Sequence, residues 1–114
     1  ANNPTETEIQ LVLLKSNKLD ILRVLNFPNP FSKETQFTFE LTKDAKVSIS
    51  IYTISGRKVK SFIERNQKIG FNRITWNGRD EYGNLLANGV YLYKIKAEIN
   101  NQKINHIGRL AIYR

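Results

Sequence analysis

Residues 36–52 read QFTFELTKDAKVSISIY, and apolar and polar side chains alternate through both halves of this segment. A repeat of two is typical of an antiparallel strand that buries one face and exposes the other. The polar residues Thr42-Lys-Asp-Ala45 separate the two halves and favour a turn. This segment therefore predicts two half-buried strands joined by a turn, which indicates an all-β protein.

The same pattern continues toward both ends of the chain. The further strands that we expect cover residues 9–14, 19–25, 57–64, 71–76, 90–97 and 103–113. Turn signals separate them: Ser55-Gly56, residues 65–70, the polar residues 77–88, and Asn100-Asn101. No helical repeat persists for three turns. The sequence therefore predicts an antiparallel β-sandwich of about seven strands after residue 34.

Two blocks bracket this domain, the segment Val24-Leu-Asn-Phe-Pro-Asn-Pro-Phe31 and the segment WNGRDEYGNLLANGVYLY at positions 76–93. Each proline lacks an N–H group and favours extended geometry in the residue before it, so the first block predicts a stiff corner. We expect Phe27 and Phe31 to anchor that corner to the core, and Trp76 to pack inward. Glycines at positions 56, 70, 78 and 89 are expected where turns need a positive φ or a close backbone approach.

The composition bounds the possible functions. A length of 114 residues and a hydrophobic content of 40% fit one globular domain. The chain has no cysteine, which excludes disulfides and thiolate chemistry. No apolar run approaches the length of a membrane span, so direct membrane insertion is not expected.

Positive charge is concentrated in the second part of the chain. Residues 1–44 carry five basic and six acidic side chains, whereas residues 45–114 carry thirteen basic and four acidic ones. One basic stretch consists of Arg57, Lys58, Lys60, Arg65, Lys68 and Arg73. It could form a solubilising face or meet an acidic protein surface. Nucleic-acid binding is not expected, since no zinc finger or RNP-like aromatic pattern is present and the interleaved aromatics Phe62 and Phe71 are expected in the core.

The side chains that carry chemistry in enzymes are scarce. His106 is the single histidine and lies in a strand-like segment, which leaves neither a nucleophile–base pair nor a usual zinc ligand set. Asp80 and Glu81 lie among asparagines in residues 77–88; we interpret them as turn-forming side chains rather than calcium ligands. The sequence thus predicts no catalytic, cofactor-binding or metal-binding residues, and no enzyme activity. Carbohydrate binding stays open, with Tyr52, Tyr82, Tyr91 and Tyr93 as candidate stacking platforms.

Taken as a set, several segments carry a family resemblance. They are Asn26–Phe31, Phe37–Leu41, Val47–Val59, Trp76–Asn84 and Asn88–Tyr93. Residues 24–114 resemble the type A C-terminal sorting domains of type IX secretion, and are similar to the immunoglobulin-like domain of flagellar hook-capping proteins. The resemblance implies an immunoglobulin-like sandwich that is not catalytic and directs a larger protein to the cell surface, the outer membrane or the medium. The implied partners are the translocon, shuttle and sortase proteins of that system, with no cofactor and a monomeric fragment.

The resemblance also points to particular residues. A Gly-x-Tyr motif, a motif ending in glycine after four variable residues, and a terminal basic motif can be placed one by one. The candidate residues are Gly89 and Tyr91, Ile51 and Gly56, and Arg109 and Arg114. Ile51 stands where leucine is usual, and arginine stands for lysine in the terminal motif.

The N-terminal part suggests a parent protein. Residues 18–26 resemble the link into the last domain of gingipain-like cysteine peptidases. We therefore expect residues 1–23 to be a linker or the final strand of a preceding domain. The alternatives to a sorting signal are a retained C-terminal domain of a cell-surface sortase-like peptidase, a carbohydrate- or matrix-binding module, and a hook-capping domain.

Overall fold

Eight strands and no helix make up the secondary structure of residues 18–62 and 65–114, the part of the chain that the computed structural model describes. The strands are β1 (Ile21–Phe27), β2 (Thr35–Leu41), β3 (Ala45–Thr53), β4 (Lys58–Ser61), β5 (Arg65–Gln67), β6 (Gly70–Trp76), β7 (Gly89–Ile99) and β8 (Gln102–Ile112). No helix long and apolar enough to cross a membrane occurs within these residues.

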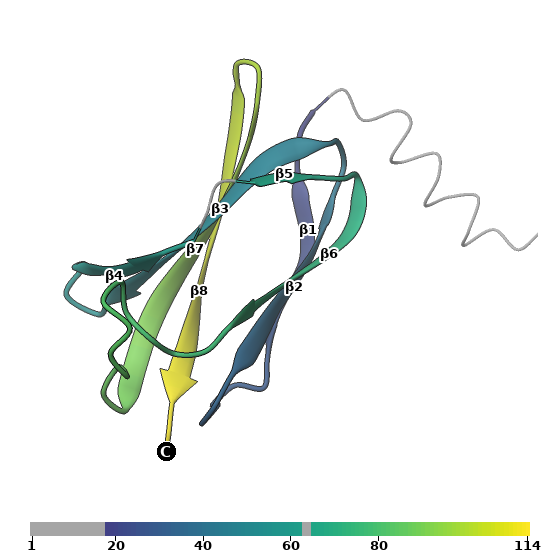
Figure 1. Ribbon diagram of the computed structural model, residues 1–114. Helices are drawn as coiled ribbons and strands as arrows, with labels where there is room; N and C mark the ends of the chain where they lie inside the picture. The colour runs from purple at the N-terminus through teal and green to yellow at the C-terminus, as the bar shows by residue number, and fades with distance from the viewer. Residues whose placement is uncertain (1–17, 63–64) are drawn as a thin grey trace, which may run out of the picture.

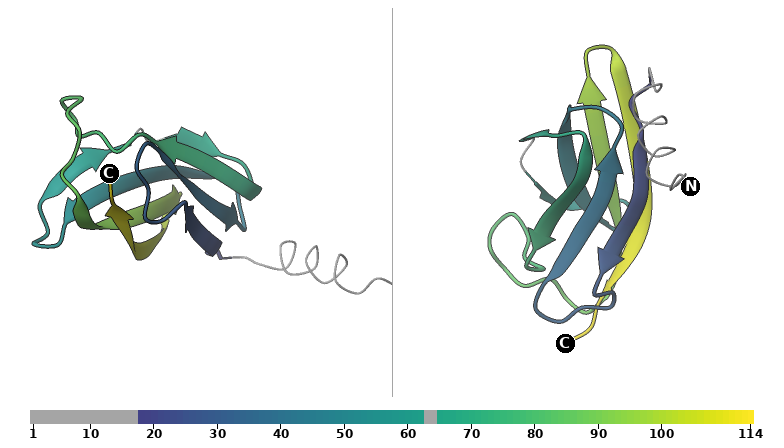
Figure 2. Two further views of the ribbon diagram at one scale, coloured as in Figure 1. Left: turned by 90° about the horizontal axis from the view of Figure 1, so that it is seen from below. Right: turned by 90° about the vertical axis from the view of Figure 1, so that its right-hand side faces the viewer.

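Two antiparallel sheets face each other (Figures 1 and 2). One has the order β1-β2-β6; the other has the order β4-β3-β7-β8, with β5 also paired to β3. The all-β sandwich expected from the sequence is confirmed. Seven strands, β2–β8, follow residue 34, as expected, and one of them is β5, formed against the start of β3 by residues 65–67, which were expected in a loop.

The core lies between the sheets and consists of the apolar members of each alternating pattern. Phe37, Phe39 and Leu41 of β2 are fully buried, as are Ile49 and Ile51 of β3. Burial of each such side chain stabilises the fold by about 1.5–3 kcal/mol relative to exposure. Trp76 lies in the same core, as the sequence predicted.

The turn between β2 and β3 carries the chain from one sheet to the other, which the alternation could not reveal. Thr42 fixes this crossing, because its buried hydroxyl accepts a hydrogen bond from the Asp20 amide at 2.7 Å and donates to the Lys18 carbonyl at 2.9 Å. The crossing is thereby tied to the segment that leads into β1. β1 begins at Ile21 and Leu19 is buried, so residues before position 24 contribute to the sandwich. The strand expected over residues 9–14 lies outside the described residues.

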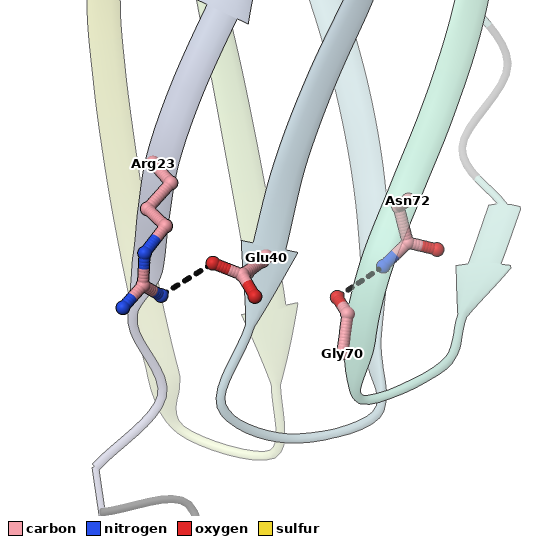
Figure 3. Close-up of polar contacts among 4 residues, drawn as sticks. All are labelled: Arg23, Glu40, Gly70 and Asn72. Carbon is pink, nitrogen blue, oxygen red and sulfur yellow. Dashed lines mark hydrogen bonds and ion pairs between the residues drawn. The ribbon is translucent and has the colours of Figure 1, made fainter. Parts of the chain in front are cut away.

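Two local side-chain interactions stabilise the three-stranded sheet β1-β2-β6 (Figure 3). Arg23, whose φ is 50°, lies at a bulge of β1 and forms an ion pair with Glu40 on β2. At the start of β6, the side-chain amide of Asn72 donates to the Gly70 carbonyl at 3.0 Å and to the Lys68 carbonyl at 2.9 Å. The bulge leaves Asn26 facing the core and Phe27 facing solvent.

Two aromatic placements expected from the sequence are therefore wrong. Phe27 is 68% exposed and Phe71 is 63% exposed, although both were expected in the core. Phe71 pairs with Glu40, which lies on the outer face of β2, and the Arg73 guanidinium lies 5.9 Å from its ring centroid. Of the two rings that flank the proline corner, only Phe31 is buried.

Candidate recognition site at one end of the sandwich

The strand register places the six candidate motif residues toward one end of the sandwich, where β3 and β8 end and β7 begins (Figure 1). Gly89 pairs with Ile112 of β8, and Tyr91 lies between Leu110 of β8 and Thr53 of β3. Gly56 follows in the turn after β3, and Ile51 pairs with Tyr93. Arg109 and Arg114 lie on the last residues of β8 and just after it.

Burial divides these residues into two groups. Ile51 and Tyr91 are buried, and the Tyr91 hydroxyl donates to the Ala87 carbonyl at 2.7 Å. Both side chains therefore hold the core and the loop before β7, and a partner cannot reach them in the folded domain. The exposed members are Gly56, Gly89, Arg109 and Arg114.

Arg114 is fastened to the loop of residues 77–88. Its amide donates to the Asn88 side-chain oxygen at 3.0 Å, and the Asn88 amide group donates back to the Arg114 carbonyl at 3.3 Å. The Arg114 guanidinium donates to the carbonyl of Leu86, and lies 3.5 Å from the carbonyl of Gly78. These bonds hold the last residue against the polar loop.

Gly78 leaves room for that arrangement. Its φ is +75°, and a Cβ atom there would lie 3.0 Å from the Arg114 guanidinium and 3.1 Å from the Phe31 ring. Phe31 in turn packs edge-on against Trp76 with ring centroids 5.6 Å apart. The two sequence blocks that bracket the domain thus meet around the end of β8.

The proline corner covers the outer edge of β8. The Phe31 amide donates to the Ala111 carbonyl at 3.0 Å, and the Tyr113 amide donates to the Phe31 carbonyl at 2.9 Å. The Asn29 side chain behaves as a further strand partner: its amide donates to the Arg109 carbonyl and its oxygen accepts from the Ala111 amide, both at 3.0 Å. Sequence reasoning missed Asn29 and Asn88, because asparagine in a loop signals a turn and not its distant partner.

Asp80 stabilises a turn in residues 77–88, as the sequence predicted, whereas the Glu81 carboxylate accepts a hydrogen bond from the Ser61 amide of β4. The Asp80 carboxylate accepts hydrogen bonds from the Tyr82 amide at 2.9 Å and the Asn84 amide at 3.0 Å. The Trp76 indole donates to the Arg79 carbonyl at 3.0 Å. Within the described residues, no group of three histidine, cysteine, aspartate or glutamate side chains could hold a metal ion.

The candidate tyrosine platforms are mostly unsuitable for carbohydrate stacking. Tyr91 and Tyr93 are buried, which removes them, whereas Tyr82 is exposed. Tyr52 is half-buried between two lysine ammonium groups, Lys94 at 5.8 Å and Lys58 at 5.9 Å from its ring centroid. Burial alone would raise the Tyr52 pKa, but hydrogen bonds from Ser50 and Lys94 and the charges of both lysines outweigh it and lower that pKa.

The basic stretch at positions 57–73 does not form one face. Lys60, Arg65 and Arg73 line a cavity of about 570 Å³ between β4–β5 and β6, next to Phe62 and Trp76. Lys58 instead lies beside Tyr52 on the outside of the larger sheet. Lys68 lies between β5 and β6, with its ammonium 3.9 Å from the Asp44 carboxylate.

Several solved structures share this fold. PorU from Porphyromonas gingivalis, solved as a dimeric latent form, has a TM-score of 0.73 and 23% identity over 86% of this chain and 10% of its own. PorZ, described as an essential surface component of the type-IX secretion system of Porphyromonas gingivalis, has a TM-score of 0.51 and 23% identity over 80% of this chain and 11% of its own. FlgD from P. aeruginosa has a TM-score of 0.61 and 17% identity over 85% of this chain and 78% of its own.

At these identities the likeness shows a shared fold, and the chain spans about a tenth of the length of PorU or PorZ. A search of curated proteins found no match. The family model described as the FlgD Ig-like domain matches residues 27–101, from the end of β1 to the hairpin between β7 and β8. The chain belongs to the FlgD Ig-like domain family.

Proposed function

We propose that this chain is a C-terminal sorting domain that directs a larger protein through a type IX secretion system to the cell surface. The fold that it shares with PorU and PorZ supports this proposal, as does its membership of the FlgD Ig-like family. The observation that carries it is the anchored Arg114, which holds an exposed basic end of β8 beside Gly89. The partners would be the translocon, shuttle and sortase proteins of that system, and the destination the outer membrane, the cell surface or the medium.

The proposed mechanism assigns different tasks to the buried and exposed motif residues. Ile51 and Tyr91 keep the end of the sandwich in one shape, and Arg109 and Arg114 present charge on it. A rigid surface costs little conformational entropy when a partner binds, because the side chains and loops are already ordered. The domain needs no catalytic group for this role. A domain boundary at residue 24, with a linker or the final strand of a preceding domain before it, remains a prediction, and the burial of Leu19 and Ile21 in this sandwich argues for an earlier start.

The test is export of a reporter. The whole chain is fused behind a signal peptide and a fluorescent reporter, and expressed in a bacterium that has a working type IX system. We expect reporter at the cell surface, and less of it after Arg109→Gln than after Arg65→Gln, a matched change of an exposed arginine at the other end of the sandwich. A reporter that stays in the periplasm with the unaltered chain would refute the proposal.

A second candidate function is a C-terminal domain that is retained in a cell-surface peptidase. The match to only 10% of PorU fits one domain of a longer protein, and the resemblance of residues 18–26 to the link into the last domain of gingipain-like cysteine peptidases favours a peptidase as that protein. The two candidates differ in the fate of the domain. An immunoblot of the parent protein at the cell surface with an antibody against this chain would detect a retained domain, whereas a sorting signal that is removed would be missing from the mature product.

A further inference from the structure

A second surface of the molecule is built by residues far apart in sequence. The outer face of β3, β7 and β8, with β4 at its side, carries six basic side chains and one acidic side chain, Glu98. We call this surface the lysine face. Its basic members are Lys46, Lys58, Lys94, Lys96, Lys103 and Arg109.

Strand register sets the order of the charges. Four rows cross the sheet, and each row holds at least one basic residue. The rows are Lys46–Glu98–Lys103, Ser48–Lys96–Asn105, Ser50–Lys94–Ile107 and Lys58–Tyr52–Leu92–Arg109. These side chains point away from the core, because the alternate residues Val47, Ile49, Tyr93 and Ile95 are buried.

The middle of the lysine face has no acidic neighbour. Glu98 lies in the outermost row, where its carboxylate is 3.5 Å from the Lys103 ammonium. The rows of Lys96 and Lys94 contain serine, asparagine and isoleucine as the facing residues. Among the described residues neither lysine has an ion-pair partner; Lys94 instead lies against the Tyr52 ring.

The spacing of the charges fits an extended partner with a regular repeat. Lys94 and Lys96 occupy alternate positions of one strand and are therefore roughly 6.6–7 Å apart along it. Carboxylates at alternate positions of another strand have the same repeat, so the two sets can stay opposite each other over several rows. A bilayer offers no fixed repeat, and large exposed apolar side chains that could insert into one are few here: Ile107, which is 65% exposed, and Val90 at the margin.

We propose that the lysine face docks an acidic β-strand, a partner segment with aspartate or glutamate at alternate positions. Ser48, Asn105 and Tyr52 add hydrogen-bonding groups between the charges. Charge on both sides would speed the encounter and fix the register of the partner. The inference goes beyond the proposed function and does not depend on it, since it concerns the isolated chain whatever protein carries it.

The test uses the whole chain and a defined probe. A fluorescein-labelled peptide of about nine residues, with glutamate and threonine alternating, spans the four rows. Fluorescence anisotropy at low salt should show binding that weakens as NaCl screens the charges. The double change Lys94→Glu/Lys96→Glu should weaken binding by about tenfold or more, because two attractions become repulsions. The matched control Lys33→Glu/Arg65→Glu changes the net charge equally, but lies off the face and should weaken binding by less than about twofold.

Each further result either supports or overturns the proposal. Equal weakening by both double variants would show attraction by net charge alone and overturn it. So would equal affinity for a peptide of the same composition with all glutamates in one block, or tighter binding of phosphatidylglycerol vesicles or polygalacturonate than of the alternating peptide. Near-UV circular dichroism of Trp76 checks that the charge-reversed chain is folded. If it is not, Lys94→Gln/Lys96→Gln replaces it, with a smaller loss of affinity expected and an unchanged affinity as the contradicting result.

Discussion

At the residue scale, Gly108 shows how a close contact can require glycine without an unusual backbone angle. It lies opposite Tyr93 in the register of β7 and β8, and a Cβ atom on it would lie 2.4 Å from the Tyr93 ring. We expect Gly108→Ala to lower the free energy of unfolding by about 1–3 kcal/mol, the usual cost of overpacking a core. Urea denaturation, monitored by the fluorescence of Trp76, measures this change in the free energy of unfolding.

The same substitution in a Tyr93→Leu background tests the cause. Leucine removes the ring atoms that the new methyl group would strike, so the cost of Gly108→Ala should shrink there. A double-mutant cycle isolates this coupling. An equal cost of Gly108→Ala in both backgrounds would show that the ring is not what excludes a side chain at position 108.

Tyr93 also predicts a dependence of stability on pH. Burial raises the pKa of its phenol above the ordinary value of 10.0, so the unfolded chain loses this proton at a lower pH than the folded chain does. Its contribution to stability is therefore complete below about pH 10 and is lost as the pH rises through the folded pKa. Between about pH 9 and about pH 11, the urea midpoint should therefore fall less for Tyr93→Phe than for the unaltered chain.

The pKa of Tyr52 is shifted in the opposite direction, so this residue serves as the comparison for Tyr93. Its lowered pKa gives a contribution that is present above the unfolded value and is lost as the pH falls through the folded value. Tyr52→Phe should therefore make the fall in stability at alkaline pH steeper. A gentler fall with Tyr52→Phe would mean that the charges of Lys58 and Lys94 do not control this phenol.

Single residues also show where sequence reasoning ends. The buried positions of Phe37 and Ile49 followed from alternation alone, because each strand has one covered face. The exposure of Phe27 depends on a bulge in β1, which shifts the alternation by a residue. The need for glycine at position 108 depends on a ring that is fifteen positions away in sequence and adjacent only across the hairpin.

At the element scale, the edge of β8 is bonded by the backbone of Phe31 and by the side chain of Asn29 in the proline corner. Asn29 replaces a neighbouring strand by bonding the Arg109 carbonyl and the Ala111 amide. We expect Asn29→Ala to lower the free energy of unfolding by about 1–2 kcal/mol, since two hydrogen bonds are lost at a partly exposed site. Asn105→Ala, on the exposed side of the same strand, is the control and should change stability by less than about 0.5 kcal/mol. Similar losses for the two variants would contradict a bridging role for Asn29.

Strand partners were harder to predict than strands. The repeat of two located β2 and β3, but it reports which face is buried and not which strand lies alongside. The assignment of β2 and β3 to opposite sheets depends on Thr42 and its contacts with residues 18 and 20. β5 escaped detection because three polar residues that pair along one side with β3 carry no apolar repeat.

At the scale of the whole molecule, folding redistributes the charge. The run at positions 57–73 is continuous in sequence but is divided between a cavity, a turn and the outer sheet. The lysine face draws its members from positions 46 to 109, which only the pairing of β3, β7 and β8 brings together. The excess of positive charge is counted directly from the sequence, whereas its location on the surface required the strand register.

The division of the motif residues into buried and exposed groups predicts two kinds of defect in export. Ile51→Ala leaves a cavity in the core and should lower the free energy of unfolding by about 2–5 kcal/mol, so export would fail together with folding. Arg109→Gln removes an exposed charge, should change stability by less than about 0.5 kcal/mol, and should reduce surface display of the reporter while the purified domain melts normally. Measuring both quantities for both variants separates the roles. If Arg109→Gln lowered stability as much as it lowered display, recognition would not be the task of the basic end of β8, and that end would belong with Ile51 among the residues that only keep the sandwich folded.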